Sequence, residues 1–434
     1  MKIHFIGIGG IGVSALAQYY LAKGNEISGS DLAGSEITEF LEKKGVKIFI
    51  GSAPENISQN LDLVIYSPAV KKDNAELTEA LKIQKFKNSK IKIQSYPEAL
   101  GELTKEYFTI AVSGSHGKST TTAMIALVLI EAGLDPTIIV GTKLKEFGNS
   151  NFRAGKSKYL VIEACEYDSS FLQYEPKIIV VTNIDKEHLD YFKTFTNVKK
   201  AFNNFIAKLP KDGFLVFNKD NKNSKFKGLG YSLKQKESKK IKNILKVPGI
   251  HNVSNALAVL SVARILKIKD EITLNALSEF TGTWRRFEER EMKIGNCKLK
   301  IISDYAHHPN EIKSTLQAAR EKYSKNKIWC IFQPHQHQRT YYLFNDFVKV
   351  FRNARIDNIV ITDIYDVAGR ETKKINEEVS AEKLVKKINK KSVVYCATNE
   401  LEKFIKNLPA GGIKSGDVLI IMGAGDIYKL ADKF

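Results

Sequence analysis

The chain has 434 residues, with 67 lysines and arginines against 48 aspartates and glutamates, which gives a formal net charge of +19. Its length predicts two to four domains, and its hydrophobic content of 43% is typical of a soluble globular protein. No apolar run approaches the roughly 18 residues of a membrane-spanning helix, so no membrane association is expected.

The basic residues and the cysteines narrow the class of protein further. Ten of the 67 basic residues are arginine, which leaves 57 lysines, and these lie scattered in segments such as KQKESKKIK without interleaved aromatic residues. We therefore expect no nucleic-acid partner. Met1 leads directly into the strand-like run IHFIGIG, which argues against a signal peptide, and the four distant cysteines include no C-x-x-C pair. Both features favour a cytoplasmic protein with reduced thiols.

A first domain is predicted over residues 1–96. It reads strand, glycine loop, helix and strand through KIHFIGIGGIG, VSALAQYYLAKG and NEISGSD, and two further units follow through VKIFIG and LDLVIYSPAV. This alternation predicts a Rossmann-like α/β domain with a parallel sheet. The pattern fades in the polar, lysine-rich segment KIQKFKNSKIK, and we place the boundary near Tyr96.

The glycine loop of this domain indicates a diphosphate ligand. Gly7, Gly9 and Gly12 form G-x-G-x-x-G, with Gly10 added, and Asp31 lies 19 residues beyond Gly12. This is the dinucleotide fingerprint, in which the loop approaches a pyrophosphate and the acid binds a ribose. A UDP-sugar carries such a diphosphate as well as NAD does. The loop alone therefore leaves NAD, a UDP-sugar and a purely structural turn open.

A second domain is predicted over residues 97–284, with the mainly parallel sheet of a P-loop ATPase. It opens with AVSGSHGKSTTT, in which an apolar strand ends near Ser113, a glycine loop follows, and a helix begins near Lys118. Backbone N–H groups at such a turn bind phosphate, and the lysine reaches its outer oxygens. The loop is G-x-x-G-K-S, two residues shorter than the usual G-x-x-x-x-G-K-[ST], with Val112 where the first glycine is expected. The hydroxyl of Ser119 is expected to bind Mg²⁺.

Two neighbouring strands of this domain end in acidic and polar residues. KYLVIEA ends near Glu163, which precedes Glu166, and KIIVVTNID leads to Asn183 and His188. The carboxyl ends of parallel strands form the ligand-binding edge of an open sheet. Because this edge also carries the phosphate loop, we expect Glu163 and His188 to be functional.

The remainder of the second domain contains one more strand, GFLVFN, and then the polar segment FKGLGYSLKQKESKKIKN, which we predict as a surface excursion. The segment VPGIHNVSNALAVLSVARIL is predicted as a loop that leads into a helix, with Asn252 or Ser254 near its cap. The domain ends around TGTWRRFEER.

A third domain, residues 285–434, repeats the alternation and is predicted as Rossmann-like. Its strands are predicted in KLKIISDYAHHP, KIWCIFQPH, DNIVITDIYDVAG, SVVYCAT and DVLIIMGAGDI, and a helix is predicted in NEIKSTLQAAREKY. This pattern favours another open parallel sheet.

Seven motifs occur in one order: GSHGKSTTT, EACEYDSSF, TNIDKEHLDYF, PGIHNVSNA, RRFE, DYAHHPNEI and QPHQHQRT. Together they resemble the Mur ligase family, and the resemblance covers essentially the whole chain. It implies an ATP- and Mg²⁺-dependent ligase of peptidoglycan precursor synthesis. The chain is most similar to the members that join L-alanine to the carboxylate of UDP-N-acetylmuramate through an acyl phosphate. As partners we expect these two small molecules, and as assembly a monomer or weak homodimer.

The resemblance also implies residue roles. Lys118, Glu163, His188, His307 and Arg339 would be catalytic, and Ser119, Glu163 and His188 would bind Mg²⁺. The ATP phosphates would lie on Gly114, Ser115, His116, Gly117, Lys118, Ser119 and Thr120. Further nucleotide contacts would come from Asn183, His251, Asn252, Asn255, Arg286 and Asp304. UDP would be held by Gly7, Gly9, Gly10, Gly12, Asp31 and Ser67. Because these residues are divided between domains, we expect the second and third domains to close on each other.

Two departures from the family pattern and several alternatives stay open. Cys165 stands where the family usually has aspartate, and Gln336 where it usually has arginine. The alternative functions are a ligase that attaches a recycled cell-wall tripeptide to UDP-N-acetylmuramate, a nicotinamide-dependent dehydrogenase, and a nucleotide-binding regulator. Several of these residues also have a purely structural interpretation. Arg285 and Arg286 would then be a surface pair, His307 and His308 a helix cap, and Asp168 an N-cap. His335 and His337 would be ordinary loop residues, and His116 would only shape its loop.

Overall fold

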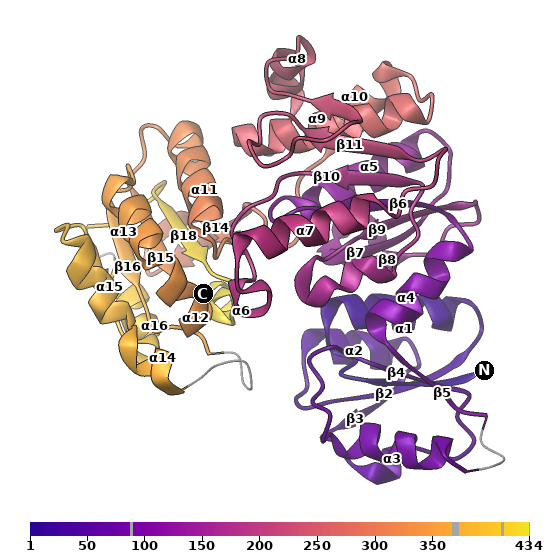
Figure 1. Cartoon of the computed structure of the whole chain (residues 1–434). Coiled ribbons are helices and arrows are strands. Elements are labelled where there is room, and N and C mark those ends of the chain that lie inside the picture. Colours follow the sequence, from indigo (N-terminus) through magenta and orange to yellow (C-terminus); the bar gives the residue numbers. More distant parts are fainter. Residues whose placement is uncertain (87–89, 367–372, 409–411, 434) are drawn as a thin grey trace. The chain divides into compact units, whose positions relative to one another are not determined.

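The computed structural model describes residues 1–86, 90–366, 373–408 and 412–433. Its strands form three sheets, which Figure 1 shows in sequence colours from indigo to yellow. The chain divides into two compact units. The first consists of Met1–Asp185, Thr196–Glu237 and Asn255–Leu277. The second consists of Lys186–Phe195, Ser238–Ser254 and Ser278–Phe434. The first and second sheets lie in the first unit, and the third sheet lies in the second.

The first sheet has five parallel strands in the order β3-β2-β1-β4-β5. Its strands are β1 (Lys2–Ile6), β2 (Glu26–Asp31), β3 (Lys47–Ile50), β4 (Leu63–Tyr66) and β5 (Lys92–Ser95). Its helical segments are α1 (Ile11–Ala22), α2 (Glu36–Lys43), η1 (Pro54–Asn56), α3 (Ala75–Gln84) and α4 (Tyr96–Lys105). The strand order reverses between β1 and β4, and the glycine loop follows β1, so the loop lies at the switch point where open sheets bind ligands.

The second sheet has seven strands in the order β12-β11-β10-β6-β9-β7-β8, all parallel except β8. The strands are β6 (Phe108–Ser113), β7 (Thr137–Leu144), β8 (Ser150–Arg153), β9 (Tyr159–Glu163), β10 (Ile178–Val181), β11 (Phe214–Asn218) and β12 (Leu229–Tyr231). The helical segments of this region are α5 (Lys118–Glu131), η2 (Lys145–Phe147), η3 (Tyr167–Gln173), α6 (Leu189–Phe192), α7 (Phe195–Ile206), α8 (Glu237–Ile244), α9 (Ile250–Ile265) and α10 (Asp270–Glu279). The phosphate loop follows the central strand β6, between β9 and β10.

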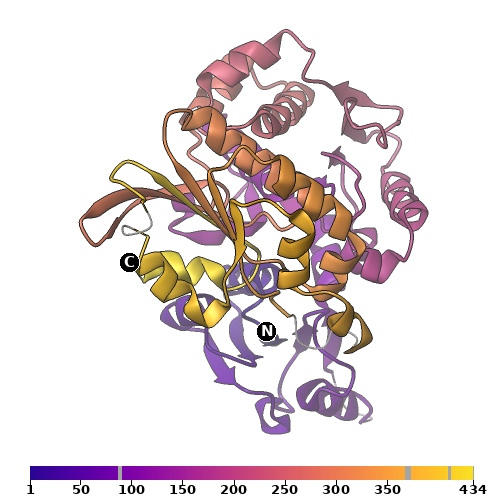
Figure 2. The ribbon, with the colours of Figure 1, turned by 90° about the vertical axis from the view of Figure 1, so that its left-hand side faces the viewer.

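The third sheet has six strands in the order β13-β14-β18-β15-β16-β17, parallel except for the β13–β14 hairpin. The strands are β13 (Glu288–Ile294), β14 (Cys297–Asp304), β15 (Ile328–Phe332), β16 (Asn358–Ile361), β17 (Val393–Tyr395) and β18 (Val418–Met422). Its helical segments are α11 (Pro309–Lys322), α12 (His337–Tyr342), α13 (Phe344–Asn353), α14 (Lys373–Glu378), α15 (Ala381–Ile388), η4 (Thr398–Glu400), α16 (Leu401–Lys406) and η5 (Ile427–Asp432). Figure 2 shows helices on both faces, and two separate apolar cores lie beneath them.

The α/β class and the parallel character of the sheets are confirmed, but some elements differ from the prediction. Strands β5, β8 and β12 are short edge strands, which need no strong apolar signal because one side faces outward. The predicted surface excursion holds β12 and helix α8. Strand β7 has a clear β-branched run in TIIV, which the expectation of helices between the strands overlooked.

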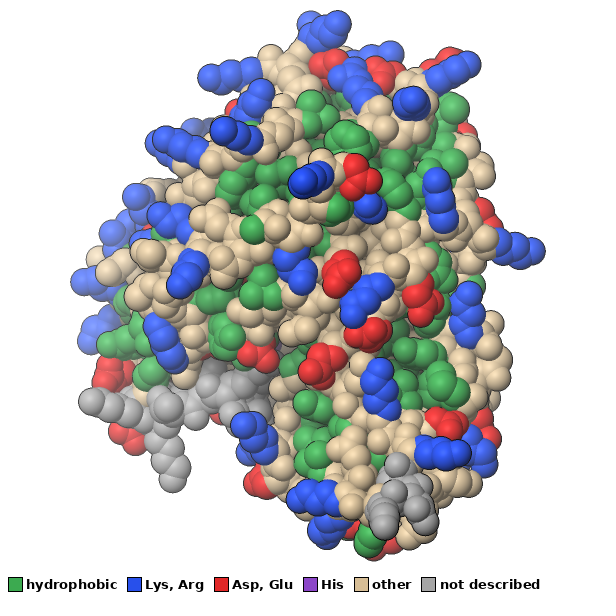
Figure 3. Space-filling view, turned by 45° about the vertical axis from the view of Figure 1, so that its right-hand side comes forward, with side chains coloured by type: hydrophobic (Ala, Val, Ile, Leu, Met, Phe, Trp, Pro, Cys, Tyr) green, Lys and Arg blue, Asp and Glu red, His purple; other side chains and the backbone are tan. Residues whose placement is uncertain are grey.

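The surface charge is dispersed on the face that Figure 3 shows. Lysine and arginine side chains are spread over this face, closer together at the upper left and alternating with acidic side chains over its centre. Several lysines are paired with carboxylates, as in Lys177–Asp212 at 2.9 Å and Lys246–Glu279 at 2.7 Å. Among the described residues, no helix combines the length and the apolarity that crossing a membrane requires.

Candidate functional site: a phosphate loop, a glycine loop and a pocket around Arg339

The phosphate loop has a backbone at two positions that residues with side chains rarely adopt. Gly114 has φ +133° and Gly117 has φ +84°. A Cβ on Gly114 would lie 2.1 Å from the hydroxyl oxygen of Thr182, and one on Gly117 would lie 2.6 Å from the amide oxygen of Asn255. The first-turn N–H groups of helix α5, which starts at Lys118, have no acceptor within the helix. This geometry suits an anion at the helix N-terminus.

The loop is braced by residues that follow strand β10. The backbone N–H of Ser115 donates to the carbonyl of Asn183 at 3.0 Å, and that of His116 to the Asn183 side-chain oxygen at 2.9 Å. The Asn183 amide group donates back to the His116 carbonyl at 2.9 Å. The ring Nε2 of His116 lies 3.3 Å from Asp185. Asn183 therefore shapes the loop, and His116 is fixed by its backbone and its ring together.

Lys118 forms a buried ion pair with Glu166. Its Nζ lies 3.0 Å and 3.3 Å from the two carboxylate oxygens, and it donates to the carbonyls of Gly114 at 2.6 Å and Ser115 at 3.3 Å. Burial disfavours the charged ammonium, but the carboxylate of Glu166, with that of Glu163 nearby, more than offsets it and raises the pKa of Lys118. The lysine therefore carries its charge at neutral pH.

The predicted metal ligands Ser119 and Glu163 lie in the first unit. Ser119 is in the first turn of α5, and Glu163 ends β9 opposite Val112 of β6. The Glu163 carboxylate accepts the N–H of Gly141 at 3.0 Å. Two oxygen donors at the carboxyl edge beside a phosphate loop fit Mg²⁺, which prefers oxygen ligands. Burial and the charge of Glu166 raise the pKa of Cys165 to about 12, so this residue is a neutral thiol.

The glycine loop of the first sheet is held by Asp31. Its carboxylate accepts the N–H groups of Gly9 and of Leu32, each at 2.8 Å. Ser67 follows β4 across the switch point, where its hydroxyl accepts the N–H of Ala69 at 3.3 Å. Gly10 is the N-cap of α1. The structure brings these predicted residues to one edge, with Asp31 also shaping the loop.

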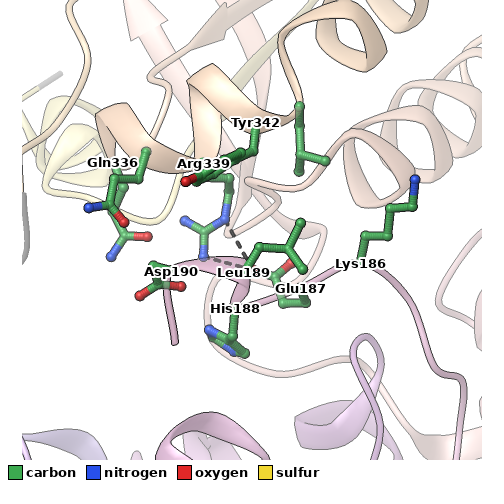
Figure 4. A pocket seen from close by; sticks show the side chains of 10 residues that line it. Lys186, Glu187, His188, Leu189, Asp190, Gln336, Arg339 and Tyr342 are labelled. Carbon is green, nitrogen blue, oxygen red and sulfur yellow. Dashed lines mark hydrogen bonds and ion pairs between the residues drawn. The ribbon is translucent and has the colours of Figure 1, made fainter. Parts of the chain in front are cut away.

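A small pocket in the second unit contains Arg339 (Figure 4). The pocket is lined by Lys186, Glu187, His188, Leu189, Asp190, Gln336, Gln338, Arg339, Tyr342 and Leu343. Arg339 donates from Nε at 3.1 Å and from Nη2 at 2.8 Å to one oxygen of Glu187. Its Nη1 donates to the carbonyl of His335 at 3.0 Å and lies 3.1 Å from the ring Nδ1. This pairing anchors the segment before α6 to helix α12.

Glu187 is buried and stays ionised. Burial opposes the charge, but Arg339, together with the neighbouring histidines, holds the pKa of the carboxyl well below its usual range. In Figure 4 the ring of His188 points away from Arg339, and the backbone of His188 is left-handed, with φ +55°. Gln336 has φ +72°, an uncommon conformation for a residue with a side chain.

His307 and His308 follow strand β14 and have different roles. His308 caps α11, because the N–H of Asn310 donates to its Nδ1 at 3.3 Å. The Nδ1 of His307 lies 3.0 Å from the carbonyl of Tyr305 and 3.4 Å from Glu311, so Nδ1 carries the proton and Nε2 is the acceptor. Burial lowers the pKa of His307 to about 4. The ring is therefore neutral at physiological pH.

Asp304 and the arginine pair are partly structural. The Asp304 carboxylate accepts N–H groups of Phe287 at 2.7 Å and Ala306 at 2.8 Å, and burial raises its pKa. Arg285 is only 4% exposed and donates to the carbonyl of Gly425 at 3.0 Å, so the surface-pair interpretation is wrong for this residue. Arg286 is half-buried, with its guanidinium 4.8 Å from the Tyr305 ring centre.

The residues of the H-N-x-x-N motif lie in helix α9, which starts at Ile250, earlier than the predicted cap. Asn252 donates to the carbonyl of Pro248 at 2.7 Å. Burial lowers the pKa of His251 to about 4. His251 and Asn252 belong to the second unit, and Asn255, whose amide lies against Gly117, belongs to the first.

Two residues of these sites were missing from the predicted set. Glu166 pairs with Lys118, and Glu187 pairs with Arg339. Both lie within recognised motifs, EACEYD and DKEHLD: Glu166 is three positions after the predicted Glu163, and Glu187 is adjacent to the predicted His188. The signal that could have identified them is an acidic side chain beside a motif whose chemistry requires a buried cation.

Three α/β sheets, with a phosphate loop at the switch point of the central one, define a multidomain protein of the nucleotide-phosphate-binding class. Residues 2–108 match the family model described as Mur ligase family, catalytic domain, residues 112–236 the Mur ligase middle domain, and residues 285–425 the Mur ligase, glutamate ligase domain. The chain belongs to the Mur ligase family.

Named relatives match over the whole chain. It is 41% identical to a UDP-N-acetylmuramate--L-alanine ligase of Acetivibrio thermocellus, over 100% of this chain and 95% of the relative, and 40% identical to one of Clostridium botulinum, over 100% and 97%. The structure is similar to that of UDP-N-acetylmuramate-alanine ligase from Thermotoga maritima, with a TM-score of 0.82 and 29% identity over 100% of this chain and 98% of that one. A murein peptide ligase from Psychrobacter arcticus shares the fold, with a TM-score of 0.71 and 22% identity.

Proposed function

We propose that this protein joins L-alanine to the carboxylate of UDP-N-acetylmuramate with hydrolysis of ATP, in the cytoplasm, as a step of peptidoglycan precursor synthesis. The observation that carries the proposal is the braced phosphate loop, with its buried Lys118, in a chain about 40% identical along its whole length to ligases of that name. We expect the enzyme to work as a monomer or weak homodimer.

The ATP end of the reaction belongs to the first unit. The first-turn N–H groups of α5 would bind the phosphates, and Lys118 would neutralise charge on the β-phosphate and on the transferred γ-phosphate, since phosphoryl transfer depends mainly on positioning and electrostatics. Mg²⁺ bound by Ser119 and Glu163 would supply further positive charge at the transferred phosphate, and His188, which belongs to the second unit, would join them only on closure. Asn183 holds the loop in shape for this task, and the amide of Asn255 lies beside Gly117.

The UDP-substrate also belongs to the first unit. The glycine loop and Asp31 lie at the switch point of the first sheet, where a diphosphate would bind the start of α1. A cavity of about 340 Å³ opens beside this helix, with Gln18, Phe40 and Asn151 in its lining. Its volume and mixed polar and apolar lining suit a sugar.

The amino-acid end is assigned to the second unit. His307 is neutral, and its Nε2 would accept a hydrogen bond from the amino group of L-alanine. Arg339 and Gln336 line the pocket of Figure 4, where a substrate carboxylate would compete with Glu187 for the guanidinium group of Arg339. The γ-phosphate of ATP passes to the substrate carboxylate, which gives an acyl phosphate and ADP. The amine then attacks the carbonyl carbon and the C–N bond forms. The C–O bond to phosphate breaks in the tetrahedral intermediate, and phosphate leaves as HPO4²⁻ with the proton that the amine has lost.

A phosphate-release assay tests the function. Purified protein receives ATP, Mg²⁺ and UDP-N-acetylmuramate with L-alanine, glycine, L-serine or the tripeptide, and Lys118→Ala serves as the inactive control. A small pocket gains only about 1–3 kcal/mol per methylene, so L-alanine should exceed glycine by roughly ten- to a hundredfold in kcat/KM. If phosphate is released with the tripeptide and not with L-alanine, the protein catalyses the recycling reaction instead. If the turnover of Lys118→Ala stays within about threefold of wild type, Lys118 has no role in the mechanism.

A further inference from the structure

The ammonium group of Lys118 is expected to bind a phosphate, but in this structure it is paired with a carboxylate. Both oxygens of Glu166 lie within 3.3 Å of its Nζ, and the two side chains are 1% and 13% exposed, respectively. An ammonium group surrounded in this way has its charge balanced without nucleotide. A phosphate oxygen that approaches the same nitrogen must compete with Glu166 for it.

The segment that carries Glu166 is built to hold it there. The N–H of Ser169 donates to the carbonyl of Glu166 at 3.0 Å, and that of Phe171 to the carbonyl of Cys165 at 3.2 Å. The ring of Phe171 is fully buried and stacks on Phe205 with centroids 4.5 Å apart. The backbone that carries Glu166 is therefore fixed to the core of the second sheet by Phe171, a few residues further along the chain.

Two strained residues lie in this segment. Asp168 and Ser169 follow each other with φ +54° and φ +55°, the left-handed region that residues with side chains seldom adopt. Strain of this kind persists only where the surrounding structure enforces it, and it gathers at functional sites. Here the two left-handed residues follow two and three positions after Glu166, which itself has helical backbone angles.

We infer that Glu166 is a positioning residue that stands in for nucleotide phosphate: it holds Lys118 in the nucleotide-free enzyme and is exchanged for a phosphate oxygen when nucleotide binds. The inference rests on the proposed ATP site. The exchange gives Glu166 two opposite effects. It stabilises the empty protein by pairing a buried cation, and it weakens nucleotide binding because the pair must first be broken.

Glu166→Gln separates these effects, because glutamine keeps the shape and removes the charge. Calorimetry should show that ADP, measured with Mg²⁺ and separately with EDTA, binds about tenfold tighter, the value of one charge-assisted hydrogen bond that no longer has to be broken. The midpoint of thermal unfolding without nucleotide should fall, and the rise on adding ADP should be larger than in wild type. A residue with a purely structural role would not strengthen binding when it is replaced.

Three controls assign the effect to Lys118. Glu166→Asp keeps the carboxylate and should bind ADP more nearly as wild type does. Glu175→Gln removes the same charge from an exposed position in the same region and should change nothing. In a Lys118→Ala background, Glu166→Gln should no longer strengthen ADP binding, because the lysine that transmits the effect is absent.

The outcomes are distinguishable. Unchanged or weaker ADP binding in Glu166→Gln would overturn the inference and leave the ATP site in place. Equal strengthening in the Lys118→Ala background would overturn it too, because Glu166 would then act on phosphate directly. A wild-type protein that binds no ADP would overturn the ATP site itself, and the inference with it.

Discussion

At the scale of single residues, the candidate sites are organised around buried charges that have one main partner each. Lys118 depends on Glu166, and Arg339 depends on Glu187. Removing one member of such a pair leaves an uncompensated charge and costs roughly 3–5 kcal/mol of stability. Mutations at these positions therefore change folding and catalysis together, and measurements of activity alone cannot separate the two.

The buried histidines predict how stability depends on pH. The pKa values of His251 and His307 are lowered by burial to about 4, whereas an unfolded chain titrates near 6.5. Between these values the unfolded state binds protons that the folded state excludes, so stability is complete above pH 6.5 and falls as the pH decreases. Each histidine contributes a slope of about 1.4 kcal/mol per pH unit.

Unfolding midpoints in urea, measured between pH 7 and pH 4.5, test this dependence. The variants His251→Gln and His307→Gln should each flatten the loss of stability towards acid, and the double variant should flatten it most. A wild-type slope in the double variant would show that other groups, such as the carboxyl of Glu187 at lower pH, control acid unfolding.

At the scale of elements, the start of α1 predicts a specific way to block the UDP-substrate. Gly10 has ordinary backbone angles, and a Cβ there would meet nothing closer than 3.4 Å. Gly10→Val should therefore fold normally and weaken binding of UDP-N-acetylmuramate by more than about tenfold, because the new side chain lies where the diphosphate approaches the helix. ADP binding should be unchanged, and calorimetry measures both.

Gly12→Val is the informative contrast. A Cβ on Gly12 would lie 2.8 Å from the hydroxyl oxygen of Tyr96, so this change disturbs the packing of α1 on α4 before any ligand is present. We expect Gly12→Val to lower the unfolding temperature, unlike Gly10→Val. Full affinity for the UDP-substrate in Gly10→Val would contradict the assignment of this loop.

Sequence patterns predicted the features that are local. Both glycine loops, the strand–loop–helix around Lys118 and most strands are written in short runs of neighbouring residues. The partners of the cations are not local. Glu166 is 48 positions from Lys118, and Glu187 is 152 positions from Arg339. Only the fold brings such residues together, and in a single sequence nothing marks which of several acids near a motif is the partner.

At the scale of the whole molecule, the predicted site residues are divided between the two units. The phosphate loop, Glu163 and Asn255 belong to the first unit, whereas His307 and Arg339 belong to the second. We expect closure when ATP and UDP-substrate bind, because an acyl phosphate must be kept from water. Small-angle scattering with a non-hydrolysable ATP analogue plus UDP-N-acetylmuramate should show a smaller radius of gyration than scattering without ligands. Identical profiles would contradict closure.

The interleaving of the two units along the chain has a consequence for how the protein is made. The first unit includes residues as far as Leu277, and the second takes the two short segments Lys186–Phe195 and Ser238–Ser254 from within it. On the ribosome, the first sheet is complete once residue 95 has emerged, but the unit around the phosphate loop must wait for helices α9 and α10. Because domains generally fold as units during synthesis, a nascent chain that stops before Leu277 should leave the apolar faces of the second sheet exposed and depend on chaperones.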